Sequence, residues 1–306
     1  MSAGGTVAGG PAASIATYSS PGPSGSVNAH WIAGDGGVVV VDALRELSEG
    51  RRLAERIARD GLPIVAVVLT HDHADHVGGL PALLAAASPD VAVYATQQTV
   101  DAVTGDARGL RALSRRLLGE DFPASDEFPA HTPLVDGQRL TIAGVELEAH
   151  DLGPGEAVST VVLRVVATGE LIVGDLVDNG YTPLLLEGRT AQWLTQLEEA
   201  RRRFPDGTTA YPGHGTPAPW PDLLERQVDD LSTVRGLVAT TARGRAELSA
   251  EEADVVVQAI EARFPGRPTV VPAAAVAAGL PPLAGLNVAA VAAELAAGTQ
   301  VERTRT

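Results

Sequence analysis

The feature that most constrains this chain is a short apolar run followed at once by a cluster of ligating residues. The segment 64–70 (IVAVVLT) is continuous and β-branched, which is typical of a central strand buried on both faces. Its end leads into the run His71-Asp72-His73-Ala74-Asp75-His76. We therefore expect a central sheet that carries the chemistry on a loop at a strand end, where a rigid scaffold can hold it.

The rest of the pattern predicts two halves that each give strands and then helices. Strands are predicted over 26–33, 38–42, 64–70, 91–95, 134–135, 139–142, 145–150, 159–166, 171–173 and 208–211. Helices are predicted over 48–60, 80–87, 190–204, 223–238, 249–264 and 287–295, with a partly helical insertion over 97–130. This order fits an α/β protein whose helices pack outside two central sheets.

Composition excludes several classes of protein. The net charge of −15 disfavours nucleic acid as a partner, because phosphate backbones need clustered Lys and Arg. No stretch approaches the ~20 apolar residues of a membrane span, so no membrane partner is expected. Residues 1–14 lack a basic start and an apolar core, so they are interpreted as a flexible tail instead of a signal peptide, which predicts a cytoplasmic location.

The cluster itself indicates a metal site. Three of the 7 histidines and two aspartates fall within six positions, and solvated histidines have no reason to gather behind an apolar strand. The chain has no cysteine, so a metal would be held by imidazole and carboxylate, the ligand set of zinc, iron or manganese. In an extended loop His71 and His73 point the same way toward one ion, while Asp75 and His76 can face a second.

The run resembles the HxHxDH signature of the metallo-β-lactamase superfamily, and the similarity continues in order over roughly 15–220. Gly174-Asp175, after the apolar strand 171–173, resembles the position of the family's bridging aspartate. Gly213-His214-Gly215 resembles its last histidine ligand. The resemblance implies a four-layer αββα sandwich with two metals at one edge between the sheets.

Carried over by position, the resemblance assigns His71 and His73 to the first metal. It assigns Asp75, His76 and His214 to the second metal, with Asp175 bridging both. Zinc is the expected ion at both sites, with manganese or iron as alternatives.

One position departs from the family pattern. Where the family usually has a histidine in a Pro-Gly-His-Thr-like loop, this chain has Gly153-Pro154-Gly155-Glu156-Ala157. Three interpretations are open: Glu156 is a ligand in an oxygen-rich first site, His150 reaches in instead, or the first site is weak and the protein is largely mononuclear. A carboxylate in place of an imidazole would raise the pKa of bound water and favour manganese or iron over zinc.

The resemblance implies a metal-dependent hydrolase that uses a metal-bound hydroxide on a small ester, lactone, thioester or amide. Asp75 and Asp175 would orient the nucleophile, and Tyr181 is a candidate hydrogen-bond donor to a substrate oxygen. Two alternatives remain: a non-heme iron oxygenase on the same scaffold, and a metal-binding protein without catalysis. A nuclease is disfavoured by the acidic charge.

The region 221–306 is predicted as a helical C-terminal extension packed on the same domain as 15–220. Ser249-Ala250-Glu251-Glu252 has the pattern of a capped helix start. The extension would line the substrate cleft, form a dimer contact or cover the sandwich. The Ala-rich stretches 272–280 and 288–297 favour close packing between subunits, so a homodimer is one of the expectations.

Overall fold

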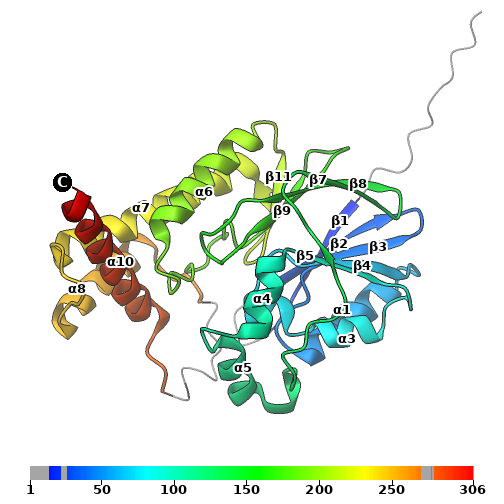
Figure 1. Cartoon of the computed structure of the whole chain (residues 1–306), viewed down its shortest axis with the longest axis horizontal. Coiled ribbons are helices and arrows are strands. Elements are labelled where there is room, and N and C mark those ends of the chain that lie inside the picture. Colours follow the sequence, from blue (N-terminus) through cyan, green and yellow to red (C-terminus); the bar gives the residue numbers. More distant parts are fainter. Residues whose placement is uncertain (1–13, 22–25, 270–276, 278, 306) are drawn as a thin grey trace, which may run out of the picture.

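The computed structural model describes residues 14–21, 26–269, 277 and 279–305. Two six-stranded mixed sheets lie face to face, and helices cover the outer face of each (Figure 1). The helices that end the chain lie together at one end of the molecule, beside α6. The prediction of an αββα sandwich with a helical C-terminal extension is therefore confirmed.

The first sheet comes from the N-terminal half of the chain. In spatial order its strands are β1 (Ser14–Ser19), β2 (Asn28–Gly34), β3 (Gly37–Val41), β4 (Ile64–Val68), β5 (Ala92–Ala95) and β6 (Thr132–Pro133). The strands β1, β2 and β3 pair antiparallel, while β3, β4, β5 and β6 pair parallel. The parallel strands all end at the same edge, which is where the His/Asp run begins.

The second sheet follows in sequence. In spatial order its strands are β12 (Ala218–Pro219), β11 (Thr209–Pro212), β10 (Leu171–Gly174), β9 (Val161–Val165), β8 (Val145–Asp151) and β7 (Gln138–Ile142). Only β10 and β11 are parallel; the other neighbours pair antiparallel. Because β10 and β11 run the same way, Asp175 and His214, which follow them, come out at one edge.

The helices fall into three groups. The first sheet carries α1 (Leu47–Ala58), α2 (Ala74–Val77) and α3 (Leu80–Ala85), and the insertion holds α4 (Gln97–Gly105), α5 (Leu110–Leu118) and the 3-10 turn Gly119–Asp121. The second sheet is followed by α6 (Thr190–Arg203), α7 (Trp220–Ala242), α8 (Ala250–Arg263) and α10 (Leu283–Arg305). Ser249 caps α8 in a reciprocal capping box with Glu252, as the sequence predicts.

The core has three layers, and strand alternation distributes side chains among them. In β3, Val38 and Val40 pack under the helices of the first sheet, whereas Val39 and Val41 face the second sheet. In β10, Leu171 and Val173 pack under the helices of the second sheet, and Ile172 faces inward. Both strands are buried on both faces, which explains why they are continuously apolar.

Several boundaries differ from the sequence prediction. Ser14, assigned to the tail, begins β1, a strand that was not predicted because its residues are only half-buried at the sheet edge. The strand expected over 134–135 lies at Thr132–Pro133, and the short β12 was missed. The last helix is longer than 287–295. The tail 1–13 and most of the Ala-rich stretch 272–280 lie outside the described residues.

Among the helices that the structure describes, none is both long enough and apolar enough to span a bilayer.

Candidate metal centre

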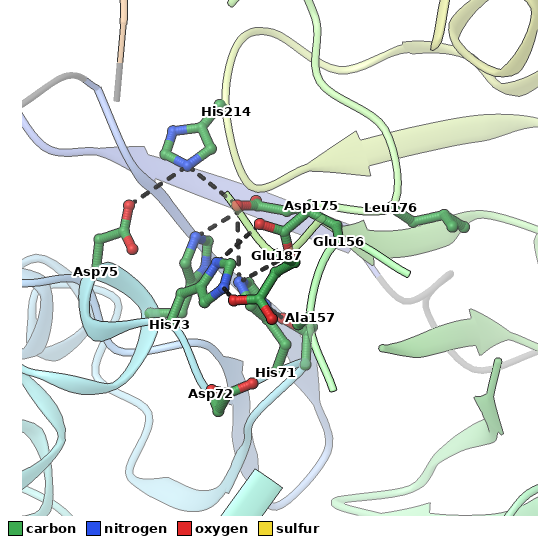
Figure 2. Close-up of polar contacts among 12 residues, drawn as sticks. His71, Asp72, His73, Asp75, Glu156, Ala157, Asp175, Leu176, Glu187 and His214 are labelled. Carbon is green, nitrogen blue, oxygen red and sulfur yellow. Dashed lines mark hydrogen bonds and ion pairs between the residues drawn. The ribbon is translucent and has the colours of Figure 1, made fainter. Parts of the chain in front are cut away.

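Four strand ends meet at one place between the sheets. Asp42 follows β3 and the His/Asp run follows β4, while Asp175 follows β10 and His214 follows β11. Because each of these pairs of strands is parallel, their carboxyl ends bring the side chains to one edge from both sheets. The loop between β8 and β9 adds Glu156 (Figure 2).

The first group of side chains comprises His71, His73, Glu156 and Asp175, all buried. His73 Nδ1 lies 2.8 Å from Glu156 Oε1. His71 Nε2 lies 3.9 Å from Glu156 Oε2 and 3.6 Å from Asp175 Oδ2. Figure 2 shows these groups pointing toward one another from different segments. Glu156 therefore occupies the place of a partner to both histidines.

The second group comprises Asp75, His76 and His214, which are also buried. His214 Nε2 lies 3.5 Å from Asp75 Oδ2 and 3.3 Å from Asp175 Oδ2. His76 Nε2 lies 3.3 Å from Asp175 Oδ1. The carboxylate of Asp175 thus stands between the two groups and contacts both.

The separations between these side chains suit ligands of divalent ions better than direct hydrogen-bond partners. Ligand atoms bound at about 2.0–2.2 Å in a tetrahedral arrangement lie roughly 3.3–3.6 Å apart. Most of the separations above are in or near that range and too long for good hydrogen bonds. Within the described part of the chain, several buried atoms make no hydrogen bond of normal geometry: His71 Nε2, His76 Nε2, His214 Nε2, both oxygens of Glu156 and Asp175 Oδ1. Buried polar atoms in native proteins are rarely left this way, so a common partner is implied.

Hydrogen bonds on the far side of three of the four rings fix which nitrogen faces the centre. The Nδ1–H of His76 donates to Asp42 Oδ2 at 2.9 Å, and that of His214 donates to the Ser26 carbonyl at 2.9 Å. The Thr70 hydroxyl donates to Asp42 Oδ2 at 2.8 Å, so its oxygen accepts from His71 Nδ1 at 2.9 Å. Each of these three rings, when neutral, is then left with an unprotonated Nε2 aimed inward, which is the form that binds a metal. His73 instead presents Nδ1 to the centre.

The carboxylates concentrate positive charge in the centre. Burial alone would lower the pKa of His214, but Asp175 outweighs it and raises that pKa to about 9. Burial is likewise outweighed at His76, where the charges of Asp175 and Asp42 raise the pKa well above its usual value. At Asp175 itself burial raises the pKa, but His76 and His214 together hold it well below its usual range. The protons on His76 and His214 thus supply positive charge that bound cations would otherwise supply.

Burial and a neighbouring charge also shift the pKa values of Glu156 and His73. Burial raises the pKa of the Glu156 carboxyl. Burial would lower the pKa of His73, but the adjacent Glu156 carboxylate raises it to about 9. A cation held between these two groups would replace the proton of His73, so cation binding should release that proton.

Three supporting residues, Asp42, Arg45 and Arg108, were missed in the sequence analysis. Asp42, with a left-handed φ of 63°, accepts from both Thr70 and His76. Arg45 forms an ion pair of 2.9 Å with Asp75. Arg108, from the loop before α5, contacts Asp72 and Glu187, and its guanidinium lies 3.1 Å from His73 Nε2. The only available signal was the position of Asp42 at the end of an apolar strand parallel to β4.

The other sequence candidates lie around this centre. The Tyr181 ring stacks obliquely on His214 at 5.6 Å, which places it beside the second group. Asp72, the remaining carboxylate of the His/Asp run, pairs with Arg108 instead of facing the two groups. His150 packs on Phe204 at 5.0 Å and belongs to neither group, so the alternative in which it replaces the missing histidine is wrong.

Two glycines let the segments approach closely. A Cβ on Gly213 would lie 2.0 Å from Asp175 Oδ1 and 2.7 Å from His76 Cε1. A Cβ on Gly174, which has a φ of 52°, would lie 2.6 Å from the Thr70 hydroxyl oxygen. Only glycine fits at these two points, because any side chain would displace the residues of the centre.

Comparison with known proteins agrees with this arrangement. A family model described as the metallo-beta-lactamase superfamily matches residues 22–214. A hydroxyacylglutathione hydrolase of Chromohalobacter salexigens is 27% identical over 183 residues, covering 58% of this chain and 56% of that protein. The metallo-beta-lactamase IND-1 of Chryseobacterium indologenes is 26% identical over 194 residues, covering 62% of this chain and 72% of that protein. The chain spans about half the length of the hydroxyacylglutathione hydrolases that it matches.

A solved structure extends the likeness to the C-terminal helices. A metallo-beta-lactamase family protein from Thermus thermophilus has a TM-score of 0.62 at 20% identity and covers 94% of both chains. At this identity the likeness concerns the fold alone.

Proposed function

We propose, on the basis that this chain belongs to the metallo-beta-lactamase superfamily, that it is a metal-dependent hydrolase of small thioesters or esters. The observation that carries the proposal is the convergence of unpartnered imidazole nitrogens and carboxylate oxygens at one buried point between the sheets. The relatives named hydroxyacylglutathione hydrolase support a thioester as the bond that is cleaved.

The donor set supports two divalent ions. His71, His73 and Glu156 would hold one ion, Asp75, His76 and His214 the other, and Asp175 would contact both. The three carboxylates of these groups carry a formal charge of −3, and Arg45 offsets one of these charges through its ion pair with Asp75. The remaining buried charge needs compensation that neutral imidazoles do not give. Zinc suits the imidazole nitrogens, while the oxygen of Glu156 makes manganese or iron an alternative for the first position.

The metal ions, when bound, would polarise the substrate carbonyl and make a water molecule a sufficiently strong nucleophile at neutral pH. The protein's own groups supply the orientation. Burial raises the pKa of Asp75, but Arg45, His76 and His214 outweigh it and hold that pKa well below its usual range. Asp75 therefore stays ionised and can accept a hydrogen bond from the attacking water.

Three further residues would act on the substrate or on the geometry of the centre. The Tyr181 ring lies beside His214, which supports a role for its hydroxyl as a hydrogen-bond donor to a substrate oxygen. Asp42 keeps His71 and His76 in the orientation that presents Nε2 inward. Arg108 holds Asp72 and Glu187 together beside His73 and so fixes one side of the centre.

The test is hydrolysis by purified protein that is metal-free, zinc-loaded or manganese-loaded, on a panel of chromogenic esters, lactones and thioesters. We expect turnover only with metal, and loss of at least about 100-fold in kcat in Asp175→Asn, since that change removes a charge between both groups. Asp206→Asn, at an exposed pair with Arg164, is the matched control and should behave as wild type.

Three results would contradict the proposal. Full activity in protein stripped of metal would show that hydrolysis does not need the metal centre. Equal inactivity of wild type and Asp175→Asn on the whole panel, with metal bound, would favour a non-catalytic metal protein. Iron in the purified protein together with oxygen consumption would favour an oxygenase.

A further inference from the structure

An apolar cavity of about 270 Å³ opens directly beside the metal centre. His73, Asp75 and Asp175 are among its lining residues, and the last of them stands between the two groups. A substrate whose carbonyl lies at the centre can therefore place one of its two substituents in this cavity. The walls of the cavity then decide which substituents are accepted.

One wall is the face of α5. Leu110, Leu113 and Leu117 line the cavity, and their spacing of three and four residues puts them on one side of the helix. All three are only half-buried, unlike a core leucine such as Leu83, which is fully buried. These leucines thus leave apolar surface uncovered toward the cavity.

Two other segments also line the cavity. Leu184 and Leu186 follow Tyr181 by a few residues, and Leu280 and Leu286 belong to the C-terminal extension. Because seven leucines from three parts of the chain converge here, the cavity is apolar almost throughout.

The C-terminal extension also fixes the wall around Leu184 in place. The buried Asn287 of α10 accepts a hydrogen bond from Leu185 N–H at 2.9 Å and donates one to the Pro183 carbonyl at 2.8 Å. These two bonds hold the backbone on both sides of Leu184. The position of this wall is therefore fixed, because a buried amide that satisfies two backbone groups is costly to move.

The cavity offers little to a polar substituent. Among its described lining residues the single Lys or Arg is Arg45, which is already paired with Asp75. A charged group such as the peptide part of a hydroxyacylglutathione would lose its hydration there without gaining a partner, and that loss is expensive. An aliphatic chain would lose no hydrogen bonds.

We propose that this cavity binds a saturated aliphatic chain joined to the reacting carbonyl, so that the substrates are medium-chain esters or thioesters. The inference rests on the proposed hydrolase function and narrows it. A cavity of about 150 Å³ lined by apolar side chains holds a six-carbon ring. The cavity here is nearly twice as large, which gives room for about ten carbons.

The first experiment compares two ester series on the metal-loaded protein. One series extends the acyl chain from acetate to dodecanoate in p-nitrophenyl esters, and the other extends the alcohol from methyl to decyl in acetate esters. Each buried methylene should raise kcat/KM about four-fold until the cavity is full. A rise in the first series supports the inference that the acyl chain lies in the cavity. A rise in the second series alone would place the leaving group there and would contradict the inference. No rise in either series would overturn the inference, whereas hydrolysis without chain-length preference would leave the hydrolase proposal standing.

Variants on α5 give a matched test. In Leu113→Trp the larger side chain fills part of the cavity, so the rise should stop at chains shorter by several carbons. In Leu118→Trp the same change is made on the same helix at a position outside the cavity lining, so the chain-length profile should be that of wild type. Identical profiles for the two folded variants would contradict the assignment of this cavity.

A binding measurement separates the cavity from catalysis. Titration of metal-free protein with 2-hexanone, 2-octanone and 2-decanone by calorimetry should show the dissociation constant falling by about four-fold per methylene. Leu186→Asp, at a rim position that is 39% exposed and so tolerant of change, should weaken 2-decanone binding by at least ten-fold. If these ketones bind as expected while no ester is hydrolysed, the hydrolase proposal fails and the cavity assignment stands. If no ketone binds, the assignment fails.

Discussion

Asp42 is the residue whose removal gives the sharpest test of the metal centre. Its two oxygens accept three hydrogen bonds: Thr70 N–H at 2.8 Å, the Thr70 hydroxyl at 2.8 Å and His76 Nδ1–H at 2.9 Å. In Asp42→Asn the shape is kept, and asparagine tolerates the left-handed φ of this position. The amide NH₂ takes the place of one oxygen. If the NH₂ takes the position of Oδ2, it becomes a third hydrogen-bond donor. It would then face the two donors that Oδ2 accepts in wild type, the Thr70 hydroxyl and His76 Nδ1–H.

The substitution should change the tautomer of His76. To avoid a donor facing a donor, the ring must move its proton from Nδ1 to Nε2, the atom that points toward Asp175 and would bind a metal. The opposite amide rotamer spares His76 but sets the NH₂ against Thr70 N–H. Loss of such a supporting carboxylate typically weakens metal binding by about 10- to 100-fold. This corresponds to about 1.4–2.8 kcal/mol.

The assay is competition between metal-free protein and a chromogenic chelator for zinc, with circular dichroism to show that the variant is folded. Asp121→Asn is the matched control, because Asp121 likewise accepts from a backbone N–H and a hydroxyl, both of Ser48, each at 2.7 Å. We expect wild-type zinc affinity in the control. A folded Asp42→Asn protein that binds zinc within about two-fold of wild type would refute the reasoning that Asp42 sets the tautomer.

Three further predictions concern the ligands, the backbone and the pH dependence of stability. Glu156→Ala should lose about one equivalent of bound metal by elemental analysis and Glu156→His should restore it; unchanged stoichiometry in both would reject Glu156 as a ligand. Gly213→Ala should abolish tight metal binding because its Cβ would fall 2.0 Å from Asp175 Oδ1, while Gly236→Ala, on an open face of α7, should leave metal binding unchanged. Burial lowers the pKa of His30 to about 4, so the folded state keeps it neutral and loses stability as the pH falls from about 6.5 toward 4. Between pH 7 and pH 5 wild type should lose about 2 kcal/mol more unfolding free energy than His30→Gln in denaturant titrations, and equal losses would contradict this assignment.

Much of the fold could be predicted because strand patterns are local. The runs that became β3, β4 and β10 are continuously apolar, and burial on both faces requires nothing else of them. The edge strand β1 was missed because its half-buried, mixed sequence carries no such pattern. Its position is decided by pairing with β2, a partner that sequence periodicity alone does not reveal.

The candidate site was predicted in part for the same reason. His71, His73 and His76 lie within six positions behind one strand, so their proximity is a local property. The choice between Glu156 and His150 was different, because both lie near the end of β8. Only the packing shows that Glu156 faces His73, whereas His150 faces Phe204.

The sequence by itself determined the order of the strands and helices in broad outline, the type of ligand atoms and the family of the protein. The tertiary structure decided which distant groups meet: Asp42 with His76, Arg108 with Asp72, and the leucines of α5 with those of the C-terminal extension. The physical reason is one of range. Side-chain periodicity fixes directions over a few residues, but contacts across a hundred or more residues depend on how two sheets and their covering helices pack, and no single segment carries that information.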